Sequence, residues 1–372
     1  MIIGIPKEIK NHEYRVGMTP EAVQQTVSHG HQVIVQMSAG IGLGIGDEKY
    51  KKAGAQIAKT APDILKKAEM IVKVKEPLAV ERKMLKRGQV LFTYLHLAAD
   101  KTLTRELMAS GAVCIAYETV TDKNGRLPLL APMSKVAGRL AAQAAAHYLQ
   151  RSAGGCGKLI GGVPGVPPAR VAVLGGGVVG KNAARVAYGM GARVTILEKN
   201  ADVMDAVDAE FNGGVKTVYS SPASLERLVA DADVVIGGIL VVGEKAPKII
   251  SENMIKSMRP GSVVVDVAID QGGCIATAHP TTHDKPVFIK HNVVHYCVAN
   301  MPGAVPHTST YALNSVTTPF SLLLADKGWE AAVSENEHLK NGVSVAKGAV
   351  TCAHSAISLK IKHTPLDTML NT

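Results

Sequence analysis

Short apolar runs alternate along this chain with amphipathic segments, and polar, glycine or proline residues bound each run. The runs predict strands over residues 2–5, 31–36, 70–74, 89–95, 171–174, 194–197, 215–219, 234–236 and 263–268. Helices are predicted after the capping pair Thr19-Pro20 and over residues 63–68. Strands that alternate with helices over short connections are typical of α/β proteins with doubly wound parallel sheets.

One stretch of the chain adds chemistry to this pattern. The glycines Gly175, Gly177 and Gly180 follow an apolar strand in G-x-G-x-x-G spacing, and an alanine-rich helix comes next. In this arrangement a glycine turn and a helix N-terminus bind the pyrophosphate of a dinucleotide. The following strand ends at Glu198, whose carboxylate would accept hydrogen bonds from the adenosine ribose and repel a 2′-phosphate. The stretch therefore predicts a Rossmann domain that prefers NAD to NADP.

We predict two Rossmann-type α/β domains, each with a doubly wound parallel sheet, and a cleft between them. Residues 1–129 would form the first part of a substrate domain, and residues 130–306 the NAD-binding domain. Residues 307–372 would return to the first domain as helices, over 311–327 and 344–359. Ser134 is predicted to cap the helix that opens the second domain.

Composition narrows the class of protein. The 372 residues are 47% hydrophobic and 19% charged, as in globular proteins, and no apolar run reaches the ~18 residues of a membrane helix. The five cysteines are odd in number and widely spaced, and the N-terminus shows no secretory signal. These features predict a cytoplasmic protein without a membrane partner.

Charge and histidine content do not change this interpretation. The net charge of +10 is spread along the chain without interleaved aromatic residues, so nucleic-acid binding is not expected. The cluster His279, His283, His291 and His295 lacks nearby cysteine ligands. No metal site is predicted.

Three ionisable residues follow directly after predicted strands: Lys75, His96 and Asp270. Ligands of open α/β sheets bind at the carboxyl edge, where such residues lie. A single polar residue at a strand end is most often an ordinary solvated one, but three in equivalent places favour a functional site.

The segments around these residues resemble one family. The sequence is similar to the L-alanine dehydrogenases, in register over nearly the whole chain, and the motifs that carry the likeness are residues 6–16, 72–77, 93–98, 132–134, 174–180, 266–274 and 300–306. This resemblance implies the reversible oxidative deamination of L-alanine with NAD and water to pyruvate, ammonia and NADH.

The resemblance also implies roles for individual residues. Arg15 and Lys75 would bind the substrate carboxylate. His96 would be the catalytic acid/base, and Asp270 would complete the proton relay or stabilise the cationic imine. Further substrate contacts are implied for Tyr94, Met133 and Asn300.

Cofactor contacts carry over to a larger set of residues. The implied set is Ser134, Gly175, Gly177, Val178, Val179, Gly180, Glu198, Ser220, Ile239, Leu240, Val267, Ala268, Ile269, Asp270, Val298, Ala299, Asn300 and Met301. The chain departs from the family pattern at three positions. Glu198 stands where the family often has Asp, and Val203 and His279 replace a commonly basic residue.

Two alternatives stay open beside the alanine dehydrogenase prediction. One is a nucleotide-binding module without amino-acid chemistry, similar to the soluble part of proton-translocating transhydrogenase, which would need a membrane partner. The other is the same chemistry on another small amino acid such as glycine or serine, with Tyr94 and Met133 setting the pocket size. The family resemblance further implies a homohexamer.

Overall fold

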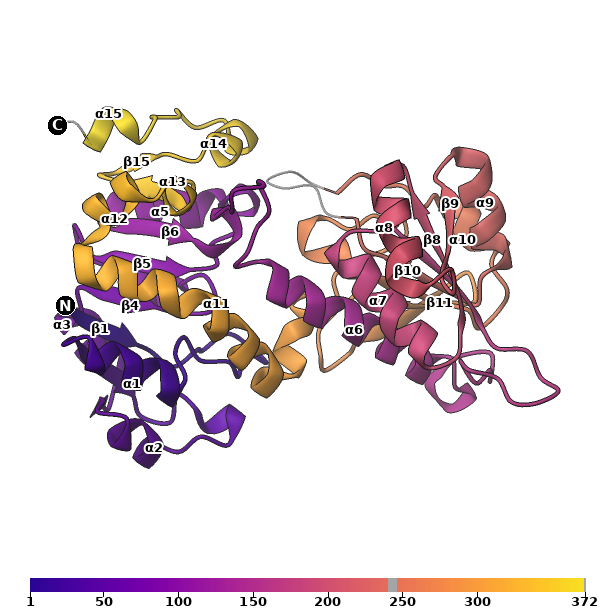
Figure 1. Cartoon of the computed structure of the whole chain (residues 1–372), viewed down its shortest axis with the longest axis horizontal. Helices are drawn as coiled ribbons and strands as arrows, with labels where there is room; N and C mark the ends of the chain where they lie inside the picture. Colours follow the sequence, from indigo (N-terminus) through magenta and orange to yellow (C-terminus); the bar gives the residue numbers. More distant parts are fainter. Residues whose placement is uncertain (240–245, 371–372) are drawn as a thin grey trace. The chain divides into compact units, whose positions relative to one another are not determined.

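Two sheets, each with its own helices, organise the chain (Figure 1). In this computed structural model, residues 1–239 and 246–370 are described. Unit 1 comprises residues 1–133 and 305–372, and unit 2 comprises residues 134–304. Each unit is an α/β body with its own sheet.

The sheet of unit 1 has eight strands in the order β15-β14-β6-β5-β4-β1-β2-β3. They are β1 (Ile2–Ile5), β2 (Gln32–Gln36), β3 (Gln56–Ala58), β4 (Met70–Val72), β5 (Val90–Thr93), β6 (Val113–Ala116), β14 (Val343–Ala346) and β15 (Ala349–Val350). Strands β1 to β6 pair in parallel, whereas β14 pairs antiparallel with both β6 and β15. The core strands β4, β5 and β6 are buried along their whole length, as expected for a sheet covered on both faces.

The helices of unit 1 connect and cover these strands. They are α1 (Pro20–Ser28), α2 (Asp47–Lys52), α3 (Ala61–Lys67), α4 (Ala79–Arg82), α5 (Lys101–Ser110), α11 (Pro306–Lys327), α12 (Trp329–Glu335), α13 (Glu337–Lys340), α14 (Ala353–Leu359) and α15 (Asp367–Leu370). The predicted cap of α1 is confirmed, because the Thr19 side chain accepts the Ala22 N–H. Figure 1 shows α11 running beside α1 on this unit.

The prediction of a helix over residues 344–359 is wrong at its start. Residues 343–350 form the hairpin β14–β15, and helix α14 begins only at Ala353. The alternation in Val343-Ser344-Val345 suits a strand. Lys347 and Gly348 both have positive φ, 47° and 81°, which a two-residue turn of type I′ requires.

The sheet of unit 2 has seven strands in the order β12-β13-β11-β10-β7-β8-β9. They are β7 (Arg170–Leu174), β8 (Arg193–Glu198), β9 (Lys216–Tyr219), β10 (Val234–Gly237), β11 (Val263–Asp266), β12 (Val287–Lys290) and β13 (Val293–Tyr296). Only the β12–β13 pair is antiparallel. Apolar clusters on both faces bury β7, β10 and β11.

In the described residues, the α-helices that accompany this sheet are α6 (Ala131–Tyr148), α7 (Val178–Gly189), α8 (Ala201–Phe211), α9 (Pro222–Asp231) and α10 (Glu252–Ser257). Helix α6 begins at Ala131, so Ser134 lies inside its first turn. The prediction of Ser134 as its N-cap is therefore wrong, because Ala131 and Pro132 already belong to the helix, and proline is well tolerated in a first turn. Over residues 1–239 and 246–370, no helix combines the length and apolar character needed to cross a membrane.

Both sheets contain the same strand order. Read from one edge, β3-β2-β1-β4-β5-β6 and β9-β8-β7-β10-β11-β13 each follow the Rossmann order 3-2-1-4-5-6. The order reverses between β1 and β4 in unit 1, and between β7 and β10 in unit 2. The predicted fold of two doubly wound sheets is confirmed, with antiparallel strands added at the edges.

A buried lysine in unit 1 provides a test of this fold. Lys73, 1% exposed, follows β4, and its Nζ lies 3.0 Å from Glu8 Oε2 and 2.7 Å from Glu81 Oε1. Burial lowers the pKa of Lys73, but the two carboxylates outweigh this effect and raise the pKa above its ordinary value. Lys73 is therefore a fixed cation in the core.

We predict that Lys73→Met destabilises the protein by about 3 kcal/mol at neutral pH, because two buried carboxylates lose their counter-ion. Burial already raises the pKa of Glu8, and loss of the cation raises it further. A carboxyl group whose folded pKa exceeds its unfolded value loses its stabilising contribution as pH rises through the folded pKa. Thermal unfolding should thus show a deficit that shrinks toward pH 5, and a deficit independent of pH would contradict the prediction.

Candidate functional site

The predicted substrate residues of unit 1 lie past the carboxyl ends of neighbouring strands. Arg15 follows β1, Lys75 follows β4, and Tyr94 and His96 follow β5. Because these strands are parallel neighbours around the β1/β4 switch point, their following segments share one edge of the sheet. Met133 joins this set, since Arg15 Nη1 lies 3.1 Å from Met133 Sδ.

Arg15 is a buried cation held by a neighbouring carboxylate. It is 2% exposed, and its Nε and Nη2 groups donate hydrogen bonds to the two carboxylate oxygens of Glu13, at 2.6 and 2.5 Å. Burial lowers the pKa of Arg15, but Glu13 outweighs this effect, so the guanidinium stays charged. The bidentate pair fixes the plane of the guanidinium.

Lys75 lies two residues beyond Lys73 and differs from it in charge pairing. Glu8 Oε1 accepts the backbone N–H groups of Val74 and Lys75 at 2.7 and 3.2 Å, which fixes the segment after β4. The Lys75 side chain is 8% exposed, and its ammonium makes no ion pair with any residue in 1–239 or 246–370. Burial raises the pKa of the neighbouring Glu76, but the charges of Lys75 and Lys10 outweigh this effect and lower it. Glu76 forms its ion pair with Lys10, which leaves the Lys75 ammonium available to an anionic ligand.

His96 has an unusual backbone conformation. Its φ of 50° and ψ of 40° are left-handed, which a non-glycine residue adopts only when its surroundings hold it there. Glu118, just past β6, accepts the backbone N–H groups of Leu95 and His96. The Tyr94 ring lies parallel to the imidazole, with centroids 5.9 Å apart.

Tyr94 forms a wall of this site. It is 3% exposed, and its hydroxyl donates to the Leu129 carbonyl at 2.6 Å. Burial raises the pKa of Tyr94 well above its ordinary value, so the phenol stays protonated at neutral pH. Its side chain therefore supplies shape and not proton transfer.

Unit 2 presents the predicted glycine turn at the β7/β10 switch point. Gly175 has a φ of 86°, which favours glycine, and Gly177 is the N-cap residue of α7. A Cβ on Gly180 would lie 1.8 Å from the Gly175 carbonyl oxygen, whereas a Cβ on Gly177 would meet no atom within 4 Å. Gly180 thus serves helix packing, and the open space at Gly177 suits the approach of a pyrophosphate.

Glu198 ends β8 beside this turn. Its carboxylate accepts the Gly176 N–H at 2.7 Å, the Lys199 N–H at 2.7 Å and the Asn200 N–H at 3.1 Å. Burial raises the pKa of Glu198, but these N–H groups outweigh that effect and lower it below its ordinary value. Glu198 is therefore a fixed anion next to the glycines.

The remaining predicted cofactor residues follow other strands of the same sheet. Ser220 follows β9, Ile239 follows β10, residues 267–270 follow β11, and residues 298–301 follow β13. Asp270 and Asn300 are brought together, because both Asp270 carboxylate oxygens lie 3.2 Å from the Asn300 N–H. Leu240 lies outside the described residues.

Asp266, at the end of β11, holds the segment that carries Asp270. It is completely buried and accepts the backbone N–H groups of Ala268, Cys274 and Ile275. Burial raises the pKa of Asp266, although these N–H groups oppose the shift. Cys274 Sγ lies 3.6 Å from the same carboxylate, so Cys274 is part of this buried cluster.

Besides Glu198, the chain departs from the family pattern at Val203 and His279, and both residues have apolar contacts. Val203 packs over the glycine turn, since a Cβ on Gly176 would lie 2.7 Å from Val203 Cγ1. His279 stacks on Phe288 with ring centroids 3.8 Å apart. In the described ranges 1–239 and 246–370, no three His, Cys, Asp or Glu side chains are placed to share a metal ion.

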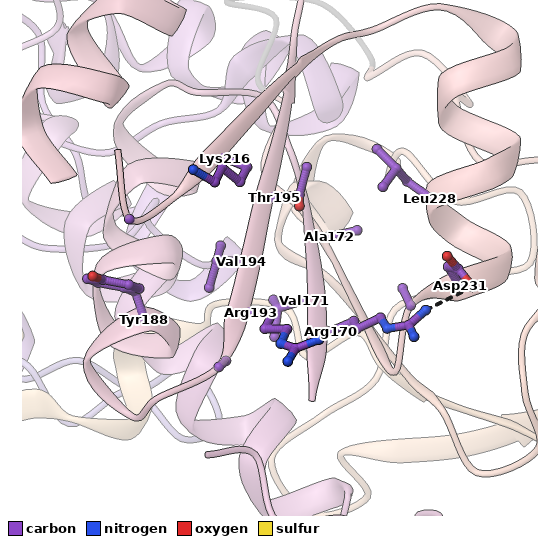
Figure 2. Close-up of a pocket in the computed structure, with 13 residues that line it drawn as sticks. Arg170, Val171, Ala172, Tyr188, Arg193, Val194, Thr195, Lys216, Leu228 and Asp231 are labelled. Atoms are coloured by element: carbon purple, nitrogen blue, oxygen red, sulfur yellow. Dashed lines mark ion pairs between the residues drawn. The ribbon is translucent and has the colours of Figure 1, made fainter. Parts of the chain in front are cut away.

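A pocket of about 450 Å³ lies at the opposite, amino edge of the unit 2 sheet (Figure 2). Arg170, Arg193 and Lys216 line it, and they are the first residues of β7, β8 and β9. All three are exposed, and Arg170 pairs with Asp231 at 3.0 Å. This pocket is separate from the glycine turn, which follows the carboxyl end of β7.

Comparisons with known proteins agree with this geometry. The family description "Alanine dehydrogenase/PNT, N-terminal domain" matches residues 4–137, and "Alanine dehydrogenase/PNT, C-terminal domain" matches residues 141–353. The chain belongs to the alanine dehydrogenase/PNT family. This confirms the resemblance that the motifs indicated.

Individual relatives cover the whole chain. Alanine dehydrogenase of Halomonas elongata is 54% identical over 94% of this chain and 95% of its own length. That of Bacillus subtilis is 51% identical over 100% of this chain and 98% of its own length. A solved L-alanine dehydrogenase structure superposes with a TM-score of 0.93 at 47% identity, covering 97% of this chain and 99% of its own.

A transhydrogenase structure from Sinorhizobium meliloti is also similar. It superposes with a TM-score of 0.82 at 27% identity and covers 94% of this chain and 100% of its own. Both kinds of protein share the fold, but the alanine dehydrogenases are closer in sequence.

Four carboxylates that fix the segments of the site were not predicted from the sequence. Glu8, Glu13, Glu118 and Asp266 accept N–H groups of the segments that carry the predicted residues. Glu8 and Glu13 lie inside the motif of residues 6–16, which offered a signal. Glu118 lies outside every recognised motif and is separated by 22 residues from the N–H that it accepts, so no local pattern points to it.

We predict that Gly177→Ala keeps the fold but weakens NADH binding at least about tenfold, because the new methyl group fills space beside the pyrophosphate. Gly180→Ala is the matched control and should destabilise unit 2 by about 1–3 kcal/mol through its clash with the Gly175 carbonyl. Thermal unfolding and NADH fluorescence titration of both variants check this. Unchanged NADH affinity in Gly177→Ala would mean that the pyrophosphate lies elsewhere.

Proposed function

We propose that this protein catalyses the reversible, NAD-dependent oxidative deamination of L-alanine to pyruvate and ammonia. Support comes from its family and from relatives named alanine dehydrogenase that are about half identical over nearly their full length. The proposal assigns substrate binding to unit 1 and dinucleotide binding to unit 2. The predicted cleft between the two domains stays a prediction.

The observation that carries the substrate assignment is the contrast between two buried lysines. Lys73 is neutralised by Glu8 and Glu81, whereas Lys75 has no ion-pair partner in the described part of the chain. Arg15, on the neighbouring strand segment, is held rigidly by Glu13. A substrate carboxylate is thus proposed to bind between the Arg15 guanidinium and the Lys75 ammonium.

His96 is proposed to handle the protons of the reaction. It would accept the proton of the substrate ammonium group and release it to solvent before hydride transfer. It would then accept a proton from the water that adds to the iminium carbon and deliver it to the amino group, which leaves as ammonia while the hydroxyl group of the carbinolamine loses its proton and becomes the carbonyl. An imidazole suits such transfers near neutral pH. Asp270 is proposed to stabilise the positive charge of the iminium, and its contact with Asn300 fixes its carboxylate.

The dinucleotide is proposed to bind at the carboxyl edge of the unit 2 sheet. The residues proposed to hold it are the glycine turn, Glu198, Ser220, Ile239 and residues 267–270 and 298–301. A dinucleotide held there would supply the acceptor for the hydride that leaves the substrate Cα. The fixed carboxylate of Glu198 favours NAD over NADP, because it would repel a 2′-phosphate.

We also propose a cytoplasmic location and a homohexameric assembly. A cytoplasmic location is consistent with free cysteines at all five positions. A homohexamer is implied by the family resemblance alone, and light scattering would measure it. A transhydrogenase-like module is the alternative, and the lower identity to the transhydrogenase structure disfavours it.

The reaction is tested by NADH absorbance with NAD and L-alanine, and in reverse with pyruvate, ammonia and NADH. We expect turnover in both directions, with glycine and L-serine as parallel substrates that show how far the pocket accepts other amino acids. NADH binding without turnover on any of the three would contradict the proposal and favour the binding module.

We predict that His96→Ala lowers kcat at least about a hundredfold, the usual loss when a general acid/base is removed. NADH affinity should remain within about twofold, because His96 and the glycine turn belong to different units. Steady-state kinetics and NADH titration check both statements. Undiminished turnover would remove His96 from the mechanism.

We predict that Glu198→Ala weakens NAD binding about tenfold, since one or two charge-assisted hydrogen bonds to the ribose are lost. NADP binding should improve relative to NAD. The ratio of kcat/KM with the two cofactors measures the effect, and an unchanged ratio would show that Glu198 does not face the ribose.

A further inference from the structure

We propose that Glu118 is a positioning residue that holds His96 in its left-handed conformation and thereby places the imidazole for proton transfer. This inference rests on the role of His96 in the proposed function. Glu118 lies outside the motifs that indicated the site, and its carboxylate contacts the backbone of Leu95 and His96.

The geometry of the strand ends brings the two residues together. Strands β5 and β6 are parallel neighbours, with Thr93 opposite Ala116. His96 lies three residues beyond Thr93, and Glu118 lies two residues beyond Ala116 in the short 3-10 helix Tyr117–Thr119. The Glu118 side chain therefore reaches sideways under the turn that follows β5.

The contacts are backbone N–H groups received by one carboxylate. Oε1 of Glu118 accepts the His96 N–H at 2.6 Å and the Leu95 N–H at 3.2 Å, and Oε2 also lies 3.2 Å from the Leu95 nitrogen. Two successive N–H groups that converge on one oxygen require a sharp turn of the chain. These bonds to Glu118 fix the peptide plane between Leu95 and His96, and the left-handed φ of His96 turns the chain directly after that plane.

Other contacts near His96 cannot replace this one. The Tyr94 hydroxyl donates to the Leu129 carbonyl. The rings of Tyr117 and Phe92 pack edge-on, and the Tyr117 hydroxyl donates to the Lys73 carbonyl. These contacts hold the neighbours of the turn. The backbone N–H groups of Leu95 and His96 are held by Glu118, while the His96 carbonyl accepts the Ala99 N–H at 3.0 Å on the other side of the turn.

To place His96, Glu118 needs an acceptor oxygen at the right distance, whereas its charge is secondary. Glu118→Gln keeps the chain length and an acceptor oxygen, so one oxygen can still receive both N–H groups. Glu118→Asp keeps the charge but is shorter by one methylene and cannot reach the turn. The two variants therefore separate positioning from an electrostatic effect on the imidazole.

The test measures kcat, the KM for pyruvate and the NADH dissociation constant in the full-length protein. We expect Glu118→Asp to lower kcat about tenfold or more, the scale of a displaced catalytic group, with KM and NADH affinity within about twofold. Glu118→Gln should keep kcat within about threefold. The reverse order, with Gln worse than Asp, would show that the charge matters and would overturn the inference.

A double-mutant cycle ties the effect to His96. In a His96→Ala background, Glu118→Asp should change the residual kcat by less than about twofold, because its target is gone. An equal loss in both backgrounds would overturn the inference. Full turnover of His96→Ala alone would instead refute the proposed role of His96, so the two failures are distinguishable.

Asp122→Ala is the matched control. Asp122 also accepts two backbone N–H groups in the same unit, but they are those of Asn124 and Arg126 in its own loop. We expect wild-type kcat for this variant. If Asp122→Ala lowered kcat as much as Glu118→Asp does, the effect would reflect general loosening of the unit and the inference would fail.

Discussion

Carboxylates that accept backbone N–H groups at the carboxyl edge of the two sheets are the interaction on which the site depends. Parallel strands end together there, and the segments that follow them leave N–H groups without ladder partners. Glu8 receives those of the segment after β4, Glu118 those after β5, and Glu198 that of the glycine turn after β7. Asp266 and Asp270 do the same after β11 and β13. These five segments, which carry Lys75, His96, the glycine turn, Asp270 and Asn300, are thereby fixed before any ligand arrives, which is how a catalytic constellation avoids reorganisation during the reaction.

Much of this arrangement could be predicted from the sequence because its signals are local. The glycine spacing before α7, the apolar runs of β1, β7 and β11, and the Thr19-Pro20 cap depend on neighbouring residues, and the structure has them where they were expected. The hairpin over residues 343–350 was mistaken for a helix because the alanines after it suggested one continuous helix. The roles proposed for Arg15, Lys75, His96 and Asp270 came from family resemblance, since spacing alone does not assign them.

The carboxylates were harder to predict because their partners are distant in sequence. Glu8 and the Val74 N–H are separated by 66 residues, and Glu118 and the His96 N–H by 22. Such a contact can be predicted only when the strand order and register are known, because a shift of one residue in the register turns each side chain to the other face of the sheet. From the sequence alone, a glutamate after a strand is expected to be a solvated residue at the strand end. Only the neighbouring strand in the sheet shows which N–H groups it accepts.

Charge balance completes the argument for unit 1. Its buried charged residues within the described ranges are Glu8, Glu13, Arg15, Lys73, Lys75 and Glu81. Glu13 binds Arg15, and both Glu8 and Glu81 bind Lys73, so the pairing is uneven although the two signs are equal in number. The surplus negative charge lies deep, around Lys73, and the surplus positive charge is at Lys75, two residues closer to the edge of the sheet. An anion arriving at that edge meets the cation first, while the buried carboxylates that would repel it are already neutralised in part by Lys73.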